Sequence, residues 1–177
     1  MPKTEAPNMP LWSFVAALAA AALAFVGYRG DAFWCGARGL PLGTFWRPAG
    51  FSYEQLPQLD GKVVLITGAN AGLGLEVATQ CARAGATVVL ACRDSAKCAA
   101  AAQAISNATG TPASRVRPVR IDLADLTQVD VAASALLETL GALHVLINNA
   151  GVATQFPQPA LTVDGVERTF QANYLGI

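Results

Sequence analysis

Charged residues are scarce in this sequence, and neither sign is in excess. Twelve Lys or Arg residues balance twelve Asp or Glu residues among 177, so the formal net charge is zero. Proteins that bind nucleic acids or other polyanions carry a basic excess. The composition therefore gives no indication of a nucleic-acid partner.

Histidine and cysteine are also few. The one histidine, His144, lies far from Cys35, Cys81, Cys92 and Cys98, and no two cysteines form a C-x-x-C pair. A zinc site needs three or four ligands, so we predict no metal site. The cysteine spacing does not indicate a disulfide framework either, and we predict mostly free thiols in a reducing compartment.

Hydrophobic residues make up 53% of the chain, and much of that excess lies in one stretch near the N-terminus. After a tail over residues 1–10, residues 11–28 contain no charge. As a helix they would span about 27 Å, close to the thickness of a bilayer core. We predict a transmembrane anchor here. A signal peptide, an organelle transit peptide and a buried helix of a soluble domain are the alternatives.

Residues 29–60 are rich in Gly and Pro, with several aromatic residues between them, which predicts a juxtamembrane linker. Arg29, Arg38 and Arg47 follow the apolar stretch, whereas Lys3 alone precedes it. The positive-inside bias then places the following domain in the cytosol. We expect a single-pass protein of the endoplasmic reticulum, with another organelle membrane as the alternative.

From residue 61 to residue 177 short apolar runs alternate with helical patterns. The alternation predicts an α/β fold, a doubly wound parallel sheet of the Rossmann type represented by its first four strands. Pro118 would place the third strand at an edge, because proline cannot donate to a ladder. The expected strands are 62–67, 86–91, 115–121 and 143–148, and the expected helices are 73–85, 94–109, 126–140 and one from about Val163.

The strongest motif follows the first expected strand and reads TGANAGLG, from Thr67 to Gly74. Glycines let a backbone turn sharply and approach a pyrophosphate without a Cβ in the way. The helix that follows directs free N–H groups and its positive dipole end at the phosphates. A tight strand-to-helix turn that needs glycine only for its geometry is the alternative.

The ribose-reading position of a dinucleotide fold comes about twenty residues after the glycines. Here the second strand ends in Arg93-Asp94. Arg93 would clamp a 2′-phosphate and indicates NADP, whereas Asp94 would hold a 2′-hydroxyl and indicates NAD. Because Asp94 is also a good helix N-cap, we favour Arg93 as the inward residue. A surface ion pair is the alternative.

These motifs together resemble the short-chain dehydrogenase/reductase family, over about residues 60–177. TGANAGLG is similar to that family's T-G-x-x-x-G-x-G, and NNAG at 148–151 to its motif after the fourth strand. GKVVLITGANAGLG, LACRD and LTVDGVERTFQANYLG look most like the retinol dehydrogenase and WW-domain oxidoreductase branch.

The resemblance assigns roles to individual residues. It implies that the diphosphate is held by Gly68, Asn70, Gly72, Leu73 and Gly74, and the 2′-phosphate by Arg93. Asp122 and Leu123 would flank adenine, and Asn149, Ala150 and Gly151 would line the nicotinamide side. Asn173 corresponds to the asparagine of the family's Asn-Ser-Tyr-Lys catalytic set.

The sequence also departs from the family. Tyr174 is the only tyrosine after Tyr53, and no lysine follows Lys97. The family's acid–base tyrosine and its lysine are therefore missing from these residues, and we expect a C-terminally truncated sequence. For the intact protein we expect an NADP-dependent oxidoreductase of a lipophilic, retinoid- or steroid-like alcohol or carbonyl, with NAD the less favoured cofactor. A non-catalytic nucleotide-binding protein and an inert fragment are the alternatives.

Overall fold

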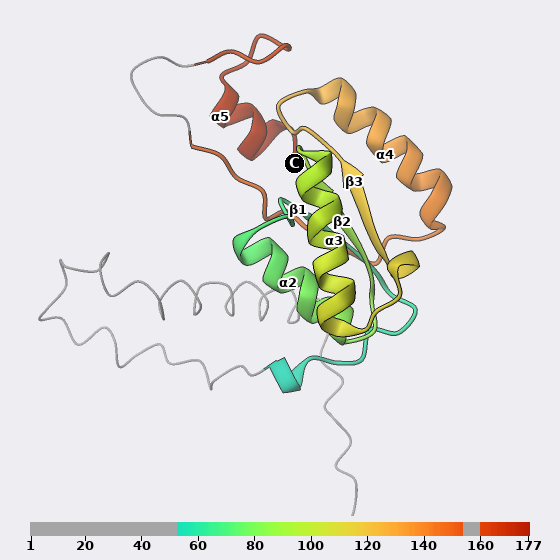
Figure 1. Ribbon diagram of the computed structural model, residues 1–177. Helices are drawn as coiled ribbons and strands as arrows, with labels where there is room; N and C mark the ends of the chain where they lie inside the picture. The colour runs from blue at the N-terminus through green and yellow to red at the C-terminus, as the bar shows by residue number, and fades with distance from the viewer. Residues whose placement is uncertain (1–52, 154–159) are drawn as a thin grey trace, which may run out of the picture. The chain divides into compact units, whose positions relative to one another are not determined.

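The computed structural model describes residues 53–153 and 160–177 (Figure 1). Two units divide the chain between Leu56 and Pro57, and the sheet with its covering helices belongs to the second unit. The expected anchor at residues 11–28 lies outside the described residues. Among those that are described, no helix is long and apolar enough to cross a membrane.

Strands and helices alternate along the second unit. The short 3-10 helix η2 (Tyr53–Gln55) precedes it. Its elements are β1 (Val63–Thr67), α2 (Gly72–Arg83), β2 (Thr87–Cys92), α3 (Ser95–Thr109), η3 (Ala113–Arg115), β3 (Val116–Arg120), α4 (Leu126–Leu140), β4 (Val145–Ile147), α5 (Arg168–Phe170) and the π-helical turn η4 (Gln171–Leu175).

All four strands form one parallel sheet in the order β3-β2-β1-β4. This is the expected Rossmann-type arrangement. Val63 of β1 lies opposite Thr87 of β2, and Val64 lies opposite Val145 of β4. Pro118 lies in β3 at one edge, as predicted, and β4 forms the other edge. The strand order reverses at β1, since β2 and β3 lie on one side of it and β4 on the other, which marks the switch point at which such sheets bind ligands.

Helices cover both faces of the two central strands. In Figure 1, α2 and α3 lie side by side over one face, where side chains such as Ile66 and Leu90 are fully buried. Because side chains alternate between faces, Leu65 and Val89 point the other way, and Leu136 of α4 packs against them. The central strands are therefore apolar on both sides.

The helix expected from Val163 begins later. Thr162 to Val166 form a turn in which Gly165 has a positive φ of 76°. Glu167 then caps α5, its carboxylate accepting from the N–H groups of Thr169 and Phe170. Val163 and Val166 have helical spacing, but the Asp-Gly pair between them favours the turn.

The expectation of free thiols was wrong for two cysteines. Cys92 and Cys98 form a disulfide with a Cα–Cα distance of 5.8 Å. Cys81 is free and buried, as expected, and burial raises the pKa of its thiol to about 12. Cys35 lies outside the described residues. The six-residue separation is no known disulfide signature; the turn from β2 into α3 brings the two cysteines together.

His144 lies within the strand expected at 143–148 but outside the observed strand. It precedes β4 and is half-buried. Its backbone N–H donates to the carbonyl of Val63, and its Nδ1 accepts from the N–H of Val63 at 3.0 Å. His144 therefore extends the pairing of β1 with β4 by one residue.

Candidate functional site

A cleft of about 350 Å³ opens where the carboxyl ends of the strands meet. Each strand contributes the residues that follow it, as the switch-point rule predicts. The lining residues are Thr67, Gly68, Asn70, Ala71, Ala91, Cys92, Arg93, Ile121, Asp122, Leu123, Ala124, Asn149, Ala150, Gly151, Val152, Arg168 and Ala172. Eight of the residues singled out from the sequence are among them: Gly68, Asn70, Arg93, Asp122, Leu123, Asn149, Ala150 and Gly151.

The glycine-rich loop forms one wall of this cleft. Gly68 has a φ of 66°, and a Cβ on it would lie 2.9 Å from the Cα of Ala150. Gly74 needs its hydrogen side chain for a different reason, since a Cβ there would lie 2.6 Å from the carbonyl oxygen of Gly68. The loop therefore packs too closely against Ala150 for a larger residue at position 68, and too closely against the first turn of α2 for a larger residue at position 74.

The N-terminus of α2 offers donors for an anion. Ala71 is the N-cap and has no side-chain oxygen to satisfy the first N–H groups of the helix. Gly72 has a φ of 58°, and no atom lies within 4 Å of where its Cβ would be. N–H groups without a side-chain cap at the start of a helix can bind a phosphate, which supplies the acceptor oxygens they lack.

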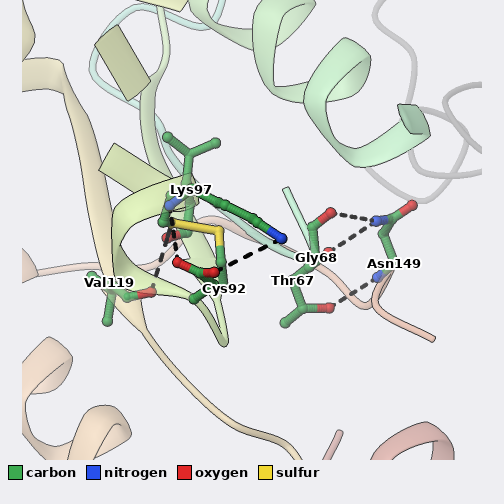
Figure 2. The surroundings of a disulfide bond; sticks show 9 residues. Thr67, Gly68, Cys92, Lys97, Val119 and Asn149 are labelled. Atoms are coloured by element: carbon green, nitrogen blue, oxygen red, sulfur yellow. Dashed lines mark hydrogen bonds and ion pairs between the residues drawn. A yellow bond between two sulfur atoms is a disulfide. The ribbon is translucent and has the colours of Figure 1, made fainter. Parts of the chain in front are cut away.

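Thr67 ties β1 to the segment after β4. Its Oγ1 accepts from the N–H groups of Asn149 and Ala150, at 3.0 Å each. The Asn149 amide donates in return to the carbonyl oxygens of Thr67 and Gly68, at 2.9 and 3.4 Å. The right-hand part of Figure 2 draws the hydrogen bonds of Asn149 with Thr67 and Gly68. The N-N-A-G segment is thereby fixed against the glycine loop.

Arg93 and Asp94, the two charged residues that follow β2, differ in their surroundings. Arg93 lines the cleft. The carboxylate of Asp94 accepts from the N–H of Lys97 at 3.0 Å and caps α3. That backbone hydrogen bond lowers the pKa of the Asp94 carboxyl. Asp94 is therefore engaged at the start of its own helix, whereas Arg93 is part of the cleft lining.

Beyond β3, Asp122 and Leu123 form the next part of the wall. One carboxylate oxygen of Asp122 accepts from the N–H of Ala124 at 3.0 Å, which fixes this turn. Leu123 lies with Ile121 in the cleft lining and contributes an apolar surface. An apolar wall beside a carboxylate suits a flat heterocycle with an amino group.

Asn173, in η4, does not line the cleft. Its Oδ1 accepts from the N–H of Val152 and its Nδ2 donates to the carbonyl of Val152, both at 2.8 Å. The side chain thus fastens the segment after N-N-A-G to η4. Gly72, Leu73 and Gly74, in the first turn of α2, are also absent from the lining.

Several cleft residues were not singled out from the sequence. They are Thr67, Ala71, Ala91, Cys92, Ile121, Ala124, Val152, Arg168 and Ala172. The position of Thr67 at the head of the glycine motif is a usable signal. Arg168 gives none, because α5 reaches the cleft only through the turn at Thr162 to Val166. It adds a second cation to the lining.

The geometry can be compared with known proteins. The family pattern described as short chain dehydrogenase matches residues 62–177. The chain belongs to the short-chain dehydrogenase family. The resemblance that the motifs indicated is therefore confirmed, and the family fold supports a nicotinamide cofactor.

Among curated members of this family, the chain is similar to retinol dehydrogenases. It is 40% identical to mouse retinol dehydrogenase 13 over 72% of this chain and 37% of that protein. It is 44% identical to human retinol dehydrogenase 11 over 67% of this chain and 36% of that protein. The chain thus spans a little over a third of the length of the curated relatives it matches.

Solved structures of short-chain dehydrogenases agree with this fold. A short-chain type dehydrogenase/reductase from Mycobacterium marinum is 30% identical, with a TM-score of 0.57 over 71% of this chain and 49% of that one. The RhlG/NADP active-site complex of Pseudomonas aeruginosa is 31% identical, with a TM-score of 0.56 over 67% of this chain and 44% of that one.

Proposed function

We propose that this chain is the cofactor-binding part of an NADP-dependent oxidoreductase. The observation that carries the proposal is the division between Arg93, which lines the cleft, and Asp94, which caps α3. A carboxylate aimed at a 2′-phosphate would repel it, and the cap keeps Asp94 occupied. A guanidinium instead makes charge-assisted, bidentate hydrogen bonds to a phosphate.

The other wall residues fit the remaining parts of the cofactor. The uncapped first turn of α2, with Gly72, Leu73 and Gly74, would hold the diphosphate together with Gly68 and Asn70. Asp122 and Leu123 would flank adenine. Asn149, Ala150 and Gly151 would line the nicotinamide side. The bound cofactor would supply or accept the hydride, and these residues would bind and orient it.

For the intact protein we propose a lipophilic alcohol or carbonyl as the substrate. The support is the similarity to retinol dehydrogenases and the apolar stretch at residues 11–28, since apolar substrates partition into bilayers. Asn173 would contribute to the catalytic set of the intact enzyme by fixing the segment at Val152 beside the nicotinamide side.

A non-catalytic nucleotide-binding role is the second candidate. The sequence observation that favours it is the absence of a Tyr-x-x-x-Lys from these 177 residues. Both candidates require the same cofactor cleft. They differ in whether a tyrosine and a lysine complete the site in the intact protein, and the full reading frame decides between them.

The test of the cofactor assignment is a pair of fluorescence titrations of the detergent-solubilised chain with NADPH and with NADH. We expect saturable binding of both, with NADPH the tighter ligand by about ten-fold, the contribution of one charged hydrogen-bonded contact. Tighter binding of NADH would show that Asp94 is the inward residue.

We further propose that residues 11–28 anchor the protein in the endoplasmic reticulum membrane, with the domain in the cytosol. The support is the arginine excess after the apolar stretch. Asn107-Ala108-Thr109 is a glycosylation triplet, and in the cytosol it stays unmodified. Endoglycosidase treatment of protein from cells tests this. A mobility shift that Asn107→Gln abolishes would place the domain in the lumen.

A further inference from the structure

The disulfide joins Cys92 to Cys98 at the edge of the cleft. The segment between the two cysteines contains Arg93, which lines the cleft. Cys92 is the last residue of β2, and Cys98 lies in the first turns of α3. The same segment contains the cap residue Asp94. Figure 2 shows the sulfur–sulfur bond beside Lys97 and Val119. The covalent link therefore fixes the end of β2 to α3 around Arg93.

The same surroundings accommodate the reduced pair. The Sγ of Cys98 lies 3.1 Å from the carbonyl oxygen of Leu90 and 4.0 Å from that of Val119. A reduced thiol would find hydrogen-bond acceptors there. Both cysteines are almost fully buried, so neither redox state exposes a large new surface. The fold itself therefore does not demand one state.

The cleft gives reagents a route to this pair. Cys92 is part of its lining and Cys98 is not, so Cys92 is the member of the pair that a small thiol or disulfide in the cleft would reach. A cofactor bound beside Arg93 would occupy the same space. Cys81 has no such route, because it is buried in α2 and its raised pKa keeps it in the unreactive thiol form.

We propose that Cys92 and Cys98 form a redox switch that sets the affinity of the cleft for the 2′-phosphate of the cofactor. The inference rests on the proposed function, because it concerns the 2′-phosphate contact at Arg93. The oxidised pair holds the Arg93 segment in its binding geometry, whereas the reduced pair leaves that segment to be ordered when the cofactor binds.

The partner in the redox step is a low-molecular-weight disulfide such as oxidised glutathione. The Cys92 thiolate attacks one glutathione sulfur, which forms a mixed disulfide and releases one glutathione. The Cys98 thiolate then attacks the Cys92 sulfur and releases the second. Two protein thiols become one disulfide, one glutathione disulfide becomes two thiols, and the two protons pass to the released glutathione.

Ordering one flexible side chain and its segment in advance changes the affinity by about five-fold. We expect the oxidised chain to bind NADPH that much more tightly than the reduced chain. The affinity for NADH should differ by less than about two-fold between the oxidised and the reduced chain, because NADH lacks the 2′-phosphate. Since coupling between two binding events is reciprocal, NADPH should also make the disulfide harder to reduce.

The experiment titrates the full chain in detergent with NADPH and NADH, in glutathione buffers that oxidise or reduce the pair. Peptide mass spectrometry after alkylation records the state of Cys92 and Cys98. The double variant Cys92→Ala/Cys98→Ala, which can form neither the disulfide nor a mixed disulfide with glutathione at these positions, should bind NADPH like the reduced chain in both buffers. Cys81→Ala, which removes a buried cysteine and leaves the pair intact, should respond as the unaltered chain does.

The outcomes separate the two proposals. Equal NADPH affinity in both buffers, or no disulfide in the oxidising buffer, overturns the switch and leaves the proposed function standing. A change of equal size for NADH and NADPH also overturns it, because the effect would then not involve the 2′-phosphate. Failure of both states to bind either cofactor overturns the proposed function and the switch together.

Discussion

Arg93 is the residue on which the choice of cofactor depends. It follows the last residue of β2 and lines the cleft. Its neighbour Asp94 has its carboxylate engaged at the start of α3. Helix capping, a local interaction, therefore engages Asp94 and leaves Arg93 as the charged residue of this pair in the cleft lining.

Substitution of Arg93 by alanine should weaken NADPH binding by about ten-fold or more, because a hydrogen bond to a charged group contributes about 1.5–3 kcal/mol. Binding of NADH should change by less than about two-fold. Arg93→Lys keeps the charge without the planar fork and should lie between. Isothermal titration calorimetry measures the affinities of the unaltered chain, Arg93→Ala and Arg93→Lys for both cofactors. Arg83→Ala, which removes an exposed arginine, is the control. Equal losses for both cofactors would contradict the 2′-phosphate role.

At the scale of single elements, hydrogen bonds between the end of β1 and the segment after β4 fix two walls of the cleft to each other. Thr67 has one hydroxyl that serves two backbone N–H groups across the sheet. It is buried, at 6% exposure, so water cannot replace a lost bond easily. The cleft wall formed by Asn149 and Ala150 is therefore positioned by a residue of the first strand.

Thr67→Val should lower the free energy of unfolding by about 1–3 kcal/mol, the cost of leaving a buried donor unsatisfied. The Ala150 N–H would lose the acceptor it has in Thr67, while Asn149 keeps the carbonyl of Ile147. Thr67→Ser keeps the hydroxyl and is the matched control. Urea denaturation measures both. A valine variant as stable as the serine variant would show that these bonds do not contribute.

The N-cap carboxylates of α3 and α4, Asp94 and Asp125, make the free energy of unfolding depend on pH in the acid range. Backbone N–H groups of Lys97 and Gln128 lower the pKa of Asp94 and of Asp125 in the folded state. A lowered folded pKa stabilises the protein above the unfolded pKa, about 3.9, and this contribution is lost as pH falls through the folded value.

The contribution of these caps to the urea midpoint of unfolding should therefore change little from pH 7 to about pH 5. At pH values below about 4 the midpoint should decrease. Asp125→Asn keeps a good N-cap without a titrating carboxyl and should flatten this fall. Asp130→Asn, on the exposed side of α4 and away from its cap, should follow the unaltered chain. An unchanged acid slope in Asp125→Asn would exclude the cap as its source.

The elements that the sequence predicted well are those with local signals. β1, β2, α3 and α4 have continuous apolar runs or recognisable caps, and α4 spans the predicted residues. The disulfide and the late start of α5 were missed because both depend on contacts made in three dimensions. The buried Gln171 side chain, for instance, bonds to Thr162 and Asp164, which holds the turn before α5. No spacing in the sequence indicates that network.

Eight of the expected site residues line one cleft because the motifs follow strand ends, and parallel strands bring their carboxyl ends together. Asn173 was predicted from family resemblance alone, and its hydrogen bonds to Val152 are a tertiary feature. Cys92 and Arg168 lie within the quoted stretches LACRD and LTVDGVERTFQANYLG, but the resemblance assigned no role to either, and both were missed as cleft residues.

At the scale of the whole molecule, an apolar groove of about 300 Å³ runs between α4 and the β4 edge. Leu137 and Leu146 are 80% and 47% exposed there. The described residues thus combine a polar cofactor cleft with an open apolar edge strand, and exposed edges of that kind favour association. Detergent is therefore useful for this chain beyond its predicted anchor.

The 177-residue chain should show no turnover of NADPH with small apolar aldehydes such as retinal. Its cleft residues bind and orient, and Asn173 cannot donate a proton to a developing alkoxide. General acid–base catalysis typically contributes about 10²–10⁴-fold. Absorbance at the NADPH band measures the rate, with Gly72→Asp as the binding-deficient control. Turnover above that control in pure protein would refute this assignment.

The central claim is that the cleft binds NADP with its 2′-phosphate on Arg93 and its diphosphate at the start of α2. The most direct measurement is a crystal structure of the chain with NADPH. We expect the guanidinium of Arg93 within about 3 Å of 2′-phosphate oxygens, and diphosphate oxygens facing the N–H groups of Gly72, Leu73 and Gly74. A cofactor bound elsewhere, or one whose ribose hydroxyls pair with Asp94, would contradict the account.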